Sequence, residues 1–322
     1  MPDLNIGGQA VIEGVMMRSK DRIATAVRLT NGEILVKNDP YRSFSSRAKV
    51  LGWPIIRGAV SFIEMLIIGM KTLNFSAEIA VKELEKKEAE TKGKEYSDSP
   101  KKTNSLYLFG SAVVALAAGI FLFFFVPLAL ASLFGVSKAA VSFNLLAGGI
   151  RLVMFVAYVW GISLLGEFKR IFQYHGAEHK SIYAYEMGDE LTPERASCHT
   201  RFHPRCGTSF ILIVALVAIL LYGISDSLFA IITGHAPALL VRFAVHFSLL
   251  PLVAGGSYEL LKLSGKTRDN ALTRILIQPG LWLQRITTKE PSLSQLEVAI
   301  AALEASLGVS VSRITSKVTA LS

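Results

Sequence analysis

The sequence predicts a mainly α-helical, polytopic membrane protein with about four transmembrane helices, a small N-terminal β unit and cytoplasmic helices. Composition is the first observation, because 51% of the 322 residues are hydrophobic and the mean hydropathy is +0.44. Charge is the second, because the net charge of +9 lies largely outside the apolar stretches. The third is that four apolar stretches approach or exceed the roughly 20 residues that cross a bilayer as a helix. Two cysteines are too few for a disulfide-based secreted domain.

Residues 1–53 are expected to form a β-hairpin unit. Two strand-like apolar runs, 23–29 and 33–37, flank Asn31 and Gly32. An Asn-Gly pair between such runs is a strong hairpin signal, because both turn positions need a positive φ. The glycine-rich start lacks the lysine and the glycine spacing of a phosphate-binding loop, so we expect no nucleotide site there.

Residues 54–88 are expected to form an amphipathic helix on the membrane surface. Charged residues recur every seven positions, which keeps them on one side of a helix, and apolar residues cover much of the rest. The charged positions are Arg57, Glu64, Lys71, Glu78 and Glu85. The apolar part is too short to cross a bilayer, and Glu64 interrupts it. Residues 89–104 are charged and polar without apolar periodicity, which predicts a flexible linker.

Residues 105–262 are expected to form a four-helix membrane domain that contains a metal-candidate loop at 167–208. The predicted spans are 106–134, 143–166, 209–225 and 238–261. The fourth contains Arg242, His246 and Glu259, and ionisable groups inside a membrane are candidates for function. We favour a structural role, in which Arg242 extends to the headgroups and His246 makes one interhelical hydrogen bond. Glu259 lies near the inner end and is a candidate to approach the loop.

Basic residues set the predicted orientation. Of the 34 Lys and Arg, 17 precede residue 105, six lie in the loop 167–208 and eight lie from residue 262 onward. The positive-inside rule then places both termini and the loop in the cytoplasm, where the cysteines stay reduced. The 17 N-terminal basic residues are accompanied by 13 acidic ones. We therefore expect contact with anionic headgroups of the lipid bilayer, and no nucleic-acid partner.

Residues 263–322 are expected to form a C-terminal cytoplasmic helical region. The Gln-Pro-Gly triplet at 278–280 predicts a turn, and Ser294 with Glu297 matches the capping box that opens a helix. Gly308 is expected to end that helix. Because the helix is amphipathic, its apolar face needs a partner, which the N-terminal β unit or the interfacial helix would supply.

Metal-binding side chains gather between residues 174 and 210, which hold four of the six histidines and both cysteines. Residues 173–185 predict a helix, so His175 and His179 project from one face, one turn apart, with Glu178 close to that face. His-x-x-Glu-His is the inverted zincin pattern, in which the histidines bind zinc and the glutamate is the general base toward the metal-bound water.

A second group of candidate ligands follows in a turn. Proline and glycine punctuate residues 203–207, which present a histidine and a cysteine at a three-residue spacing. Imidazole and thiolate both suit zinc, and two such pairs complete a tetrahedron. The predicted zinc ligands are His175, His179, His203 and Cys206. Two outcomes stay open, because four protein ligands would make a closed structural site, whereas three would leave a position for water and make Glu178 a base.

Four separated segments resemble the YqhQ-like bacterial membrane proteins. They are GGQAVIEGVMMRS at 7–19, YHGAEHKSIYAYE at 174–186, HPRCGTSF at 203–210 and QPGLWLQRITTKEPSLSQLEVAIAAL at 278–303. That family is a domain of unknown function, described in general terms as predicted metal-dependent enzymes. The resemblance implies a multi-pass protein of the bacterial inner (cytoplasmic) membrane. It also supports metal-site roles for His175, Glu178, His179, His203 and Cys206, and it implies no substrate.

Two functions from different classes fit these residues. One is a membrane-embedded metal-dependent enzyme, a zinc hydrolase of peptidase-like chemistry at the cytoplasmic membrane face, with Glu178 as base and a third ligand from His203, Cys206 or Glu259. The alternative is a non-catalytic scaffold whose structural zinc site fixes the loop and whose soluble helices dock a cytoplasmic or membrane protein. Transport is a weaker third function, because the spans show neither an internal repeat nor paired broken helices.

Overall fold

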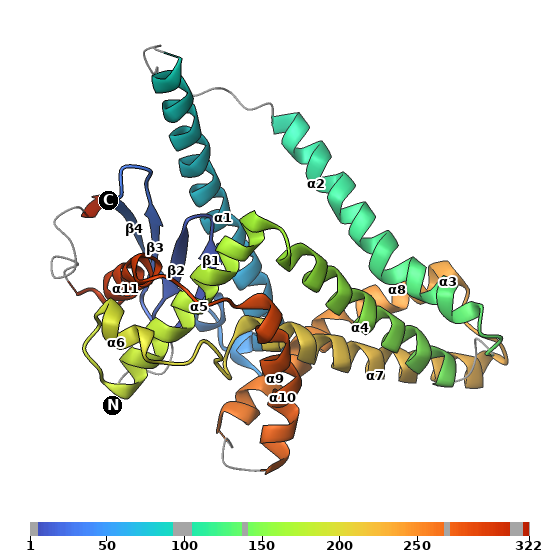
Figure 1. Cartoon of the computed structure of the whole chain (residues 1–322). Coiled ribbons are helices and arrows are strands. Elements are labelled where there is room, and N and C mark those ends of the chain that lie inside the picture. The colour runs from blue at the N-terminus through green and yellow to red at the C-terminus, as the bar shows by residue number, and fades with distance from the viewer. Residues whose placement is uncertain (1–5, 93–104, 137–140, 267–270, 310–317, 322) are drawn as a thin grey trace.

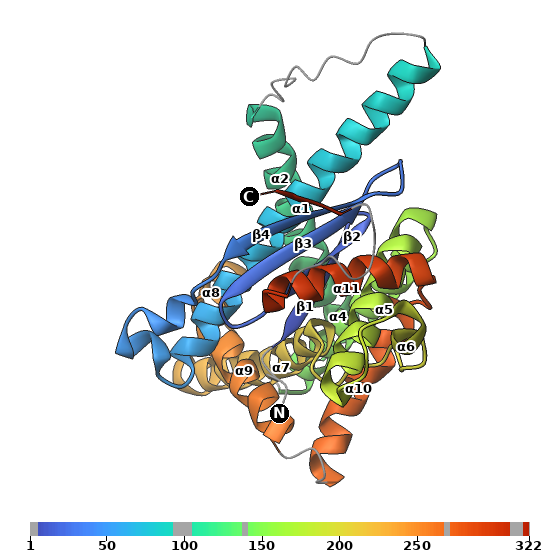
Figure 2. The same cartoon turned by 90° about the vertical axis from the view of Figure 1, so that its left-hand side faces the viewer.

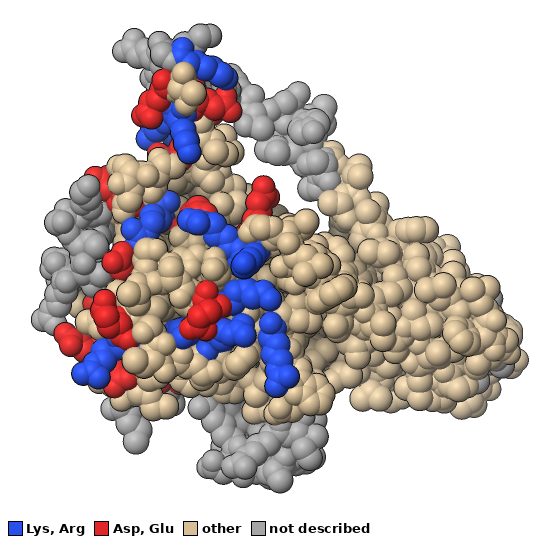
Figure 3. Space-filling view, viewed as in Figure 1, with Lys and Arg blue, Asp and Glu red and all other residues tan. Residues whose placement is uncertain are grey.

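A computed structural model describes residues 6–92, 105–136, 141–266, 271–309 and 318–321. The chain is mostly helical, as predicted, and carries a small sheet built mainly from its N-terminal residues. Figure 1 shows a body that contains the strands and, beside it, a group of long helices. In Figure 3 the charged side chains gather over the body and over one projecting helix, whereas the group of long helices shows an uncharged surface on this face. The two regions therefore present different surfaces to their surroundings.

The sheet is larger than the predicted hairpin unit. The strands are β1 (Gly7–Val11), β2 (Gly14–Arg18), β3 (Arg22–Arg28), β4 (Ile34–Pro40) and β5 (Val318–Leu321), in that order across the sheet. The first four form an antiparallel meander, and β5 pairs in parallel with β4. Strand β2 gives no alternating pattern because Gly14 and the three residues after it are all buried. Covering both faces of a strand removes the period of two that would predict it.

The predicted hairpin between β3 and β4 is present, with a longer loop than expected. The backbone N–H of Leu29 donates to Glu33 O at 2.8 Å, and Gly32 N–H donates to Leu29 O at 3.0 Å. Among these loop residues only Gly32 has a positive φ, of 86°. This is the three-residue loop that ends in a left-handed glycine, so Asn31 does not need the positive φ that a two-residue turn demands.

Helices cover both faces of the sheet. On one face, α5 (Gly166–Met187) and α11 (Leu293–Leu307) bury a core that includes Val15, Met17 and Leu303. On the other face lies α1 (Ile56–Thr91), as Figure 2 shows with α11 in front of the strands and α1 behind them. The predicted partner of the C-terminal helix is therefore confirmed as the N-terminal β unit. Helix α6 (Pro193–Ser197) is a short element that also packs against α11.

The ends of α11 are fixed by two caps. The capping box joins Ser292 to Gln295, so the predicted pair Ser294 and Glu297 was wrong. Glu297 instead accepts from Arg28 at 2.6 Å, an ion pair with β3 that the local sequence pattern does not reveal. Gly308 ends the helix as predicted, with a φ of 75° in the left-handed region.

Helix α1 begins close to the predicted residue and ends later. It reaches Thr91, so its last turn occupies the start of the predicted linker 89–104, and residues 93–104 lie outside the described part of the chain. Two of its charged side chains have partners within the protein, because Glu64 accepts from Phe44 N–H at 2.8 Å and Arg57 donates to Glu259. Its exposed apolar side chains include Ile56, Ile63, Leu66, Ile67 and Met70. An interfacial position for α1 stays a prediction.

Three helical segments of the described chain are long and apolar enough to cross a membrane, namely Val113–Ser132, Val141–Ser163 and Phe210–Thr233. They belong to α2 (Ser105–Ile120) with the π-helical η3 (Phe121–Phe125) and α3 (Val126–Ser132), to α4 (Val141–Ser163) and to α7 (Gly207–Thr233). The pair α8 (Leu239–Ser248) and α9 (Leu250–Lys266) makes a fourth if its 45° bend lies within one span. The structure therefore supports the predicted polytopic membrane protein, with three or four helices where about four were predicted.

The third and fourth predicted spans need correction. Helix α7 continues past Ser225 and carries Asp226, which is buried. Arg242 does not extend to the headgroups, because it is only 4% exposed and its Nε lies 2.9 Å from an Asp226 oxygen. His246 makes the single interhelical hydrogen bond that was expected, also to Asp226, at 3.0 Å. A carboxylate on the neighbouring helix thus holds the arginine inside, where it needs no headgroup.

Helix α10 (Ala271–Thr287) runs through the Gln-Pro-Gly triplet, so the predicted turn at 278–280 was wrong. Pro279 lies inside the helix, where its missing N–H removes one hydrogen bond. The helix packs against both α7 and α4, and this packing accounts for its continuity through the proline. Its C-terminal end points into the region between α5 and the start of α7, where the candidate ligands lie.

Candidate metal centre

Helix α5 presents three of the predicted site residues from one face. It covers the predicted helix 173–185 and ends at Gly188, whose φ of 76° gives the left-handed cap. Glu178 and His179 are buried, with 5% and 1% of their surfaces exposed. The rings of His175 and His179 lie 4.5 Å apart between centroids, as expected for an i, i+4 pair.

Cys206 joins the two histidines from the start of α7. It is the N-cap residue of that helix, and its Sγ accepts from the Thr208 N–H at 3.4 Å and lies 3.1 Å from His175 Nε2. One ligand atom from each of His175, His179 and Cys206 lies within 4.8 Å of the others, and all three residues are buried. Ligand atoms in a tetrahedral zinc site are separated by about 3.3–3.8 Å. Small side-chain movements would therefore bring this set to that geometry.

Backbone carbonyls fix both imidazoles. His175 Nδ1 lies 2.8 Å from Thr287 O, at the end of α10, and His179 Nδ1 lies 2.5 Å from Arg201 O. A carbonyl can only accept, so each Nδ1 carries a proton, and in the neutral form of each ring Nε2 has a lone pair for a metal. This is the arrangement that orients histidines toward a metal.

His179 Nε2 provides the test of whether a metal fits. This atom is buried, and it has no hydrogen-bond partner among the described residues. A buried nitrogen without a partner is costly and needs an explanation. It faces the same space as His175 Nε2 and Cys206 Sγ. The chemistry of this donor set, two imidazoles and a thiol, suits zinc.

His203, the fourth predicted ligand, lies next to this group and outside it. Gln284 of α10 holds its backbone on both sides, accepting from the His203 N–H at 2.8 Å and donating to the His203 carbonyl at 2.8 Å. Its ring lies 5.7 Å from that of His179, and its Nε2 lies 3.6 Å from a Glu186 oxygen. A role for His203 as a ligand stays a prediction.

Glu178 contacts the sheet directly. A Cβ atom at Gly8 would lie 2.9 Å from Cγ and Cδ of Glu178, so β1 packs tightly against this carboxyl group. Burial raises the pKa of Glu178, although His175, His179 and the Gly8 N–H oppose that rise. A raised pKa brings a carboxylate closer to the range in which it exchanges protons near neutral pH.

The Cys206 thiol and the His175 imidazole each shift the pKa of the other. Burial alone would raise the pKa of Cys206, but His175 and His179 hold it well below the ordinary value for a thiol. Burial would lower the pKa of His175, but the adjacent Cys206 raises it to about 9. Without a metal, the pair therefore favours thiolate beside imidazolium, and a metal that binds His175 would take the place of the proton on Nε2. Thiolate is the form of cysteine that binds a metal.

Several supporting residues have no signal in the His-x-x-Glu-His pattern. Gly8 lets β1 pack against Glu178, and the Thr287 carbonyl orients His175. Gly176 is a third such residue, because a Cβ there would lie 2.1 Å from Lys289 O. All three fall inside the segments 7–19, 174–186 and 278–303 that carry the family resemblance. Those segments could have indicated that distant parts of the chain meet here.

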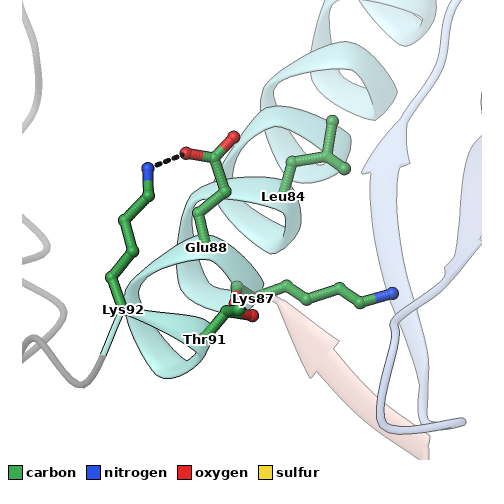
Figure 4. A pocket seen from close by; sticks show the side chains of 5 residues that line it. All are labelled: Leu84, Lys87, Glu88, Thr91 and Lys92. Atoms are coloured by element: carbon green, nitrogen blue, oxygen red, sulfur yellow. Dashed lines mark hydrogen bonds and ion pairs between the residues drawn. The ribbon is translucent and has the colours of Figure 1, made fainter.

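Glu259 and the other histidine and cysteine of segment 174–210 have different surroundings. Glu259 is ion-paired with Arg57 of α1 and is not one of the three grouped candidate ligands, so its approach to the loop stays a prediction. His199 pairs with Asp189 at 2.7 Å, and Cys198 is exposed. Figure 4 shows a surface hollow at the far end of α1, lined by Leu84, Lys87, Glu88, Thr91 and Lys92. Its lining holds no histidine or cysteine, so it offers no second transition-metal site.

Comparison with known proteins agrees with the resemblance. Residues 53–309 match the family described as "Protein of unknown function (DUF1385)". The chain is 37% identical over 298 residues to the uncharacterized protein YqhQ of Bacillus subtilis (strain 168). The matched region covers 91% of this chain and 89% of the relative. No solved structure matches it.

Proposed function

Since the chain belongs to the DUF1385 family, whose function is unknown, we propose a function from the site itself: a zinc-dependent hydrolase that acts at the cytoplasmic face of the inner membrane. One observation carries the proposal. The Nε2 of buried His179, which accepts and donates no hydrogen bond within the described part of the chain, faces the same space as His175 Nε2 and Cys206 Sγ. His175, His179 and Cys206 would hold the ion.

Three protein ligands are typical of a catalytic zinc, because they leave one position for water. Zinc bound there would lower the pKa of that water toward neutrality. The chain's own contribution is threefold. Carbonyls of Thr287 and Arg201 orient the two imidazoles, β1 holds Glu178 in place, and the Glu178 carboxylate accepts the proton.

The position of the centre supports action at a membrane surface. Cys206 lies just before the span Phe210–Thr233, and α5 follows the span Val141–Ser163 after a short connection. The distribution of Lys and Arg supports a cytoplasmic position for this end of the spans. A peptide segment at the membrane surface is the substrate that best fits the inverted zincin pattern.

Elemental analysis of the full chain purified in detergent is the first test. We expect about one zinc per chain in the wild type, retained in Glu178→Gln and in the control His199→Ala, and lost in His179→Ala and Cys206→Ala. A wild type without zinc, under conditions in which a control zinc protein keeps its metal, would remove the basis of the proposal.

Cleavage of a fluorescence-quenched peptide library is the second test. Wild type and His199→Ala should cleave it, and Glu178→Gln should not, although it still binds zinc. Because general-base loss typically costs about 10²–10⁴-fold in rate, the difference should be large. Equal cleavage by Glu178→Gln and wild type would count against the glutamate as base.

The alternative is a structural zinc site in a scaffold protein. It is favoured by the position of His203, which is buried beside the three donors, with its ring 5.7 Å from that of His179. A fourth ligand would close the coordination sphere. In that case His203→Ala should lose zinc as completely as His179→Ala does, and no variant should differ from wild type in cleavage.

A further inference from the structure

The first half of α1 lies against the helices of the membrane region. Its first turn packs closely on α9, because a Cβ at Gly58 would lie 2.8 Å from the Cα of Gly255. The Phe62 ring then contacts that of Phe210, at 6.1 Å between centroids, and Phe210 opens the span that ends at Thr233. This part of α1 therefore lies at the end of the spans that is nearest to the body.

From there α1 presents an exposed apolar face. Its members recur at spacings that place them on one side of a helix. They are Ile56, Ile63, Leu66, Ile67, Met70 and Leu73. Figures 1 and 2 together show α1 on the side of the strands that faces the long helices. A contiguous exposed apolar face marks an interaction surface, and its continuity with the start of a span indicates lipid as the partner.

The charges around this face suit anionic headgroups. Residues 41–77 contain five Lys and Arg and one acidic residue, Glu64, which is buried. The exposed cations are Arg42, Arg47, Lys49 and Lys71. Trp53, which is also exposed, belongs to a residue type that is enriched at membrane interfaces. Basic residues beside an apolar helix face favour a leaflet that carries anionic lipid.

The opposite face of α1 packs on β1. Gly69 leaves room for the Gln9 side chain, because a Cβ at position 69 would lie 2.7 Å from Gln9 Oε1. Successive residues of a strand point to opposite faces of the sheet. Gln9 therefore points to α1, whereas its neighbour Gly8 meets Glu178 on the other face. The thickness of one strand separates α1 from the candidate base.

We propose that α1 docks on an anionic lipid surface and thereby holds β1 against Glu178, so that the lipid regulates the candidate metal centre. A second contact fixes the turn after β1 to α1, because the Ile12 N–H donates to Ser76 Oγ at 3.2 Å. Close-packed elements transmit displacement, so a shift of α1 reaches Glu178 through β1. Regulation of catalysis rests on the proposed function, whereas the docking of α1 and the position of β1 do not.

The first arm of the test identifies what covers α1. A photoreactive benzophenone amino acid replaces Met70 or, as a control, Leu84, in the full chain in nanodiscs of equal parts phosphatidylcholine and phosphatidylglycerol. Both positions are exposed, by 66% and 62%, but residues 78–92 contain five acidic and four basic residues, so we expect no docking there. After irradiation, mass spectrometry should find more phospholipid adducts at position 70. Equal yields at the two positions, or cross-links from position 70 to a second copy of the chain, would overturn the proposal.

The second arm follows the amides of β1 by hydrogen–deuterium exchange, in the same nanodiscs and in nanodiscs of phosphatidylcholine alone. Exchange in wild type should be at least about threefold slower in the anionic nanodiscs. Ile63→Ser with Met70→Ser should remove this difference, and the matched pair Val81→Ser with Leu84→Ser should keep it. All four side chains are more than half exposed, so neither pair removes core packing. Equal exchange of wild-type β1 in the two bilayers would overturn the proposal without any variant.

Gln9→Ala separates docking from its effect on β1. It leaves the lipid-facing residues of α1 unchanged, so position 70 should still form lipid adducts, while the response of β1 to anionic lipid should weaken. A response as large as that of wild type would overturn the route through β1. Because neither arm depends on zinc or on cleavage, failure here is distinguishable from failure of the proposed hydrolase. If wild type cleaves peptides, it should do so faster in the anionic nanodiscs, and Ile63→Ser with Met70→Ser should not.

Discussion

Gly8 is a residue whose lack of a side chain serves the candidate centre. A Cβ there would lie 2.9 Å from two Glu178 atoms and 2.8 Å from Met16 O. Gly8→Ala should therefore displace Glu178 and destabilise the body by about 1–3 kcal/mol. Chemical denaturation measures the loss. Gly7→Ala is the matched control, because a Cβ at Gly7 meets nothing within 4 Å. Equal stability of the two variants would show that the sheet yields at Gly8.

The two cysteines offer an internal comparison at the same scale. Cys206 is held beside His175, whereas Cys198 is exposed. Zinc binding should protect the Cys206 thiolate from iodoacetamide, so its alkylation should become about tenfold faster when a chelator removes the metal. Cys198 should react at the same rate in both conditions. Peptide mass spectrometry follows both sites, and an unchanged Cys206 rate would argue against Cys206 as a ligand.

Helix α5 shows which part of the site a sequence predicts. His175, Glu178 and His179 share one face because the period of an α-helix places them there, and this needs no knowledge of the rest of the chain. The carbonyls of Arg201 and Thr287 that orient the imidazoles carry no side-chain signal. They depend on contacts made across the fold, so no local pattern could have identified them.

The same distinction explains the errors at other elements. The third span was predicted to end at Ser225 because Asp226 follows it, yet Arg242 and His246 of the next helix neutralise that carboxylate inside the bundle. Pro279 predicted a turn, yet packing against α7 and α4 keeps α10 helical. In both cases a tertiary contact compensated a local cost that the sequence alone shows.

The end of α1 is attached to the hairpin by one carboxylate. Glu83 accepts from the Thr30 N–H at 2.9 Å and from its hydroxyl at 2.5 Å. Although burial opposes it, these bonds hold the pKa of Glu83 below its ordinary value. The attachment is therefore complete above the unfolded-state pKa of about 4.3 and is lost as pH falls through the lower folded-state pKa.

Glu83→Gln should consequently speed hydrogen exchange at the Thr30 amide at neutral pH, and the difference from wild type should shrink as the solution becomes acidic. Hydrogen–deuterium exchange with mass spectrometry measures it. Glu78→Gln, on an exposed turn of the same helix, is the control and should leave the Thr30 amide unchanged. A wild-type exchange pattern in Glu83→Gln would show that other contacts hold α1 to the sheet.

Across the whole molecule, the four segments of the family resemblance converge. Segment 7–19 supplies β1 and β2, 174–186 lies in α5, 203–210 opens α7, and 278–303 runs from α10 into α11. Their shared location, around His175 and Glu178, gives a physical reason for the resemblance over so much of the chain. The sheet and α11 act as the rigid support against which the helix with the ligands packs.

The charge distribution of the whole molecule predicts its orientation in the membrane. Lys and Arg gather in the body and the N-terminal region, so the body with Cys198 should face the cytoplasm and the connection between α7 and α8 should face the opposite side. Exposed His235 lies in that connection. We expect a membrane-impermeant maleimide to label His235→Cys in intact spheroplasts, whereas Cys198, present in the same chain, should react only after lysis. Labelling of Cys198 in intact spheroplasts, with position 235 protected until lysis, would invert the topology. It would also place the candidate metal centre outside the cytoplasm, where a reduced Cys206 could not be assumed.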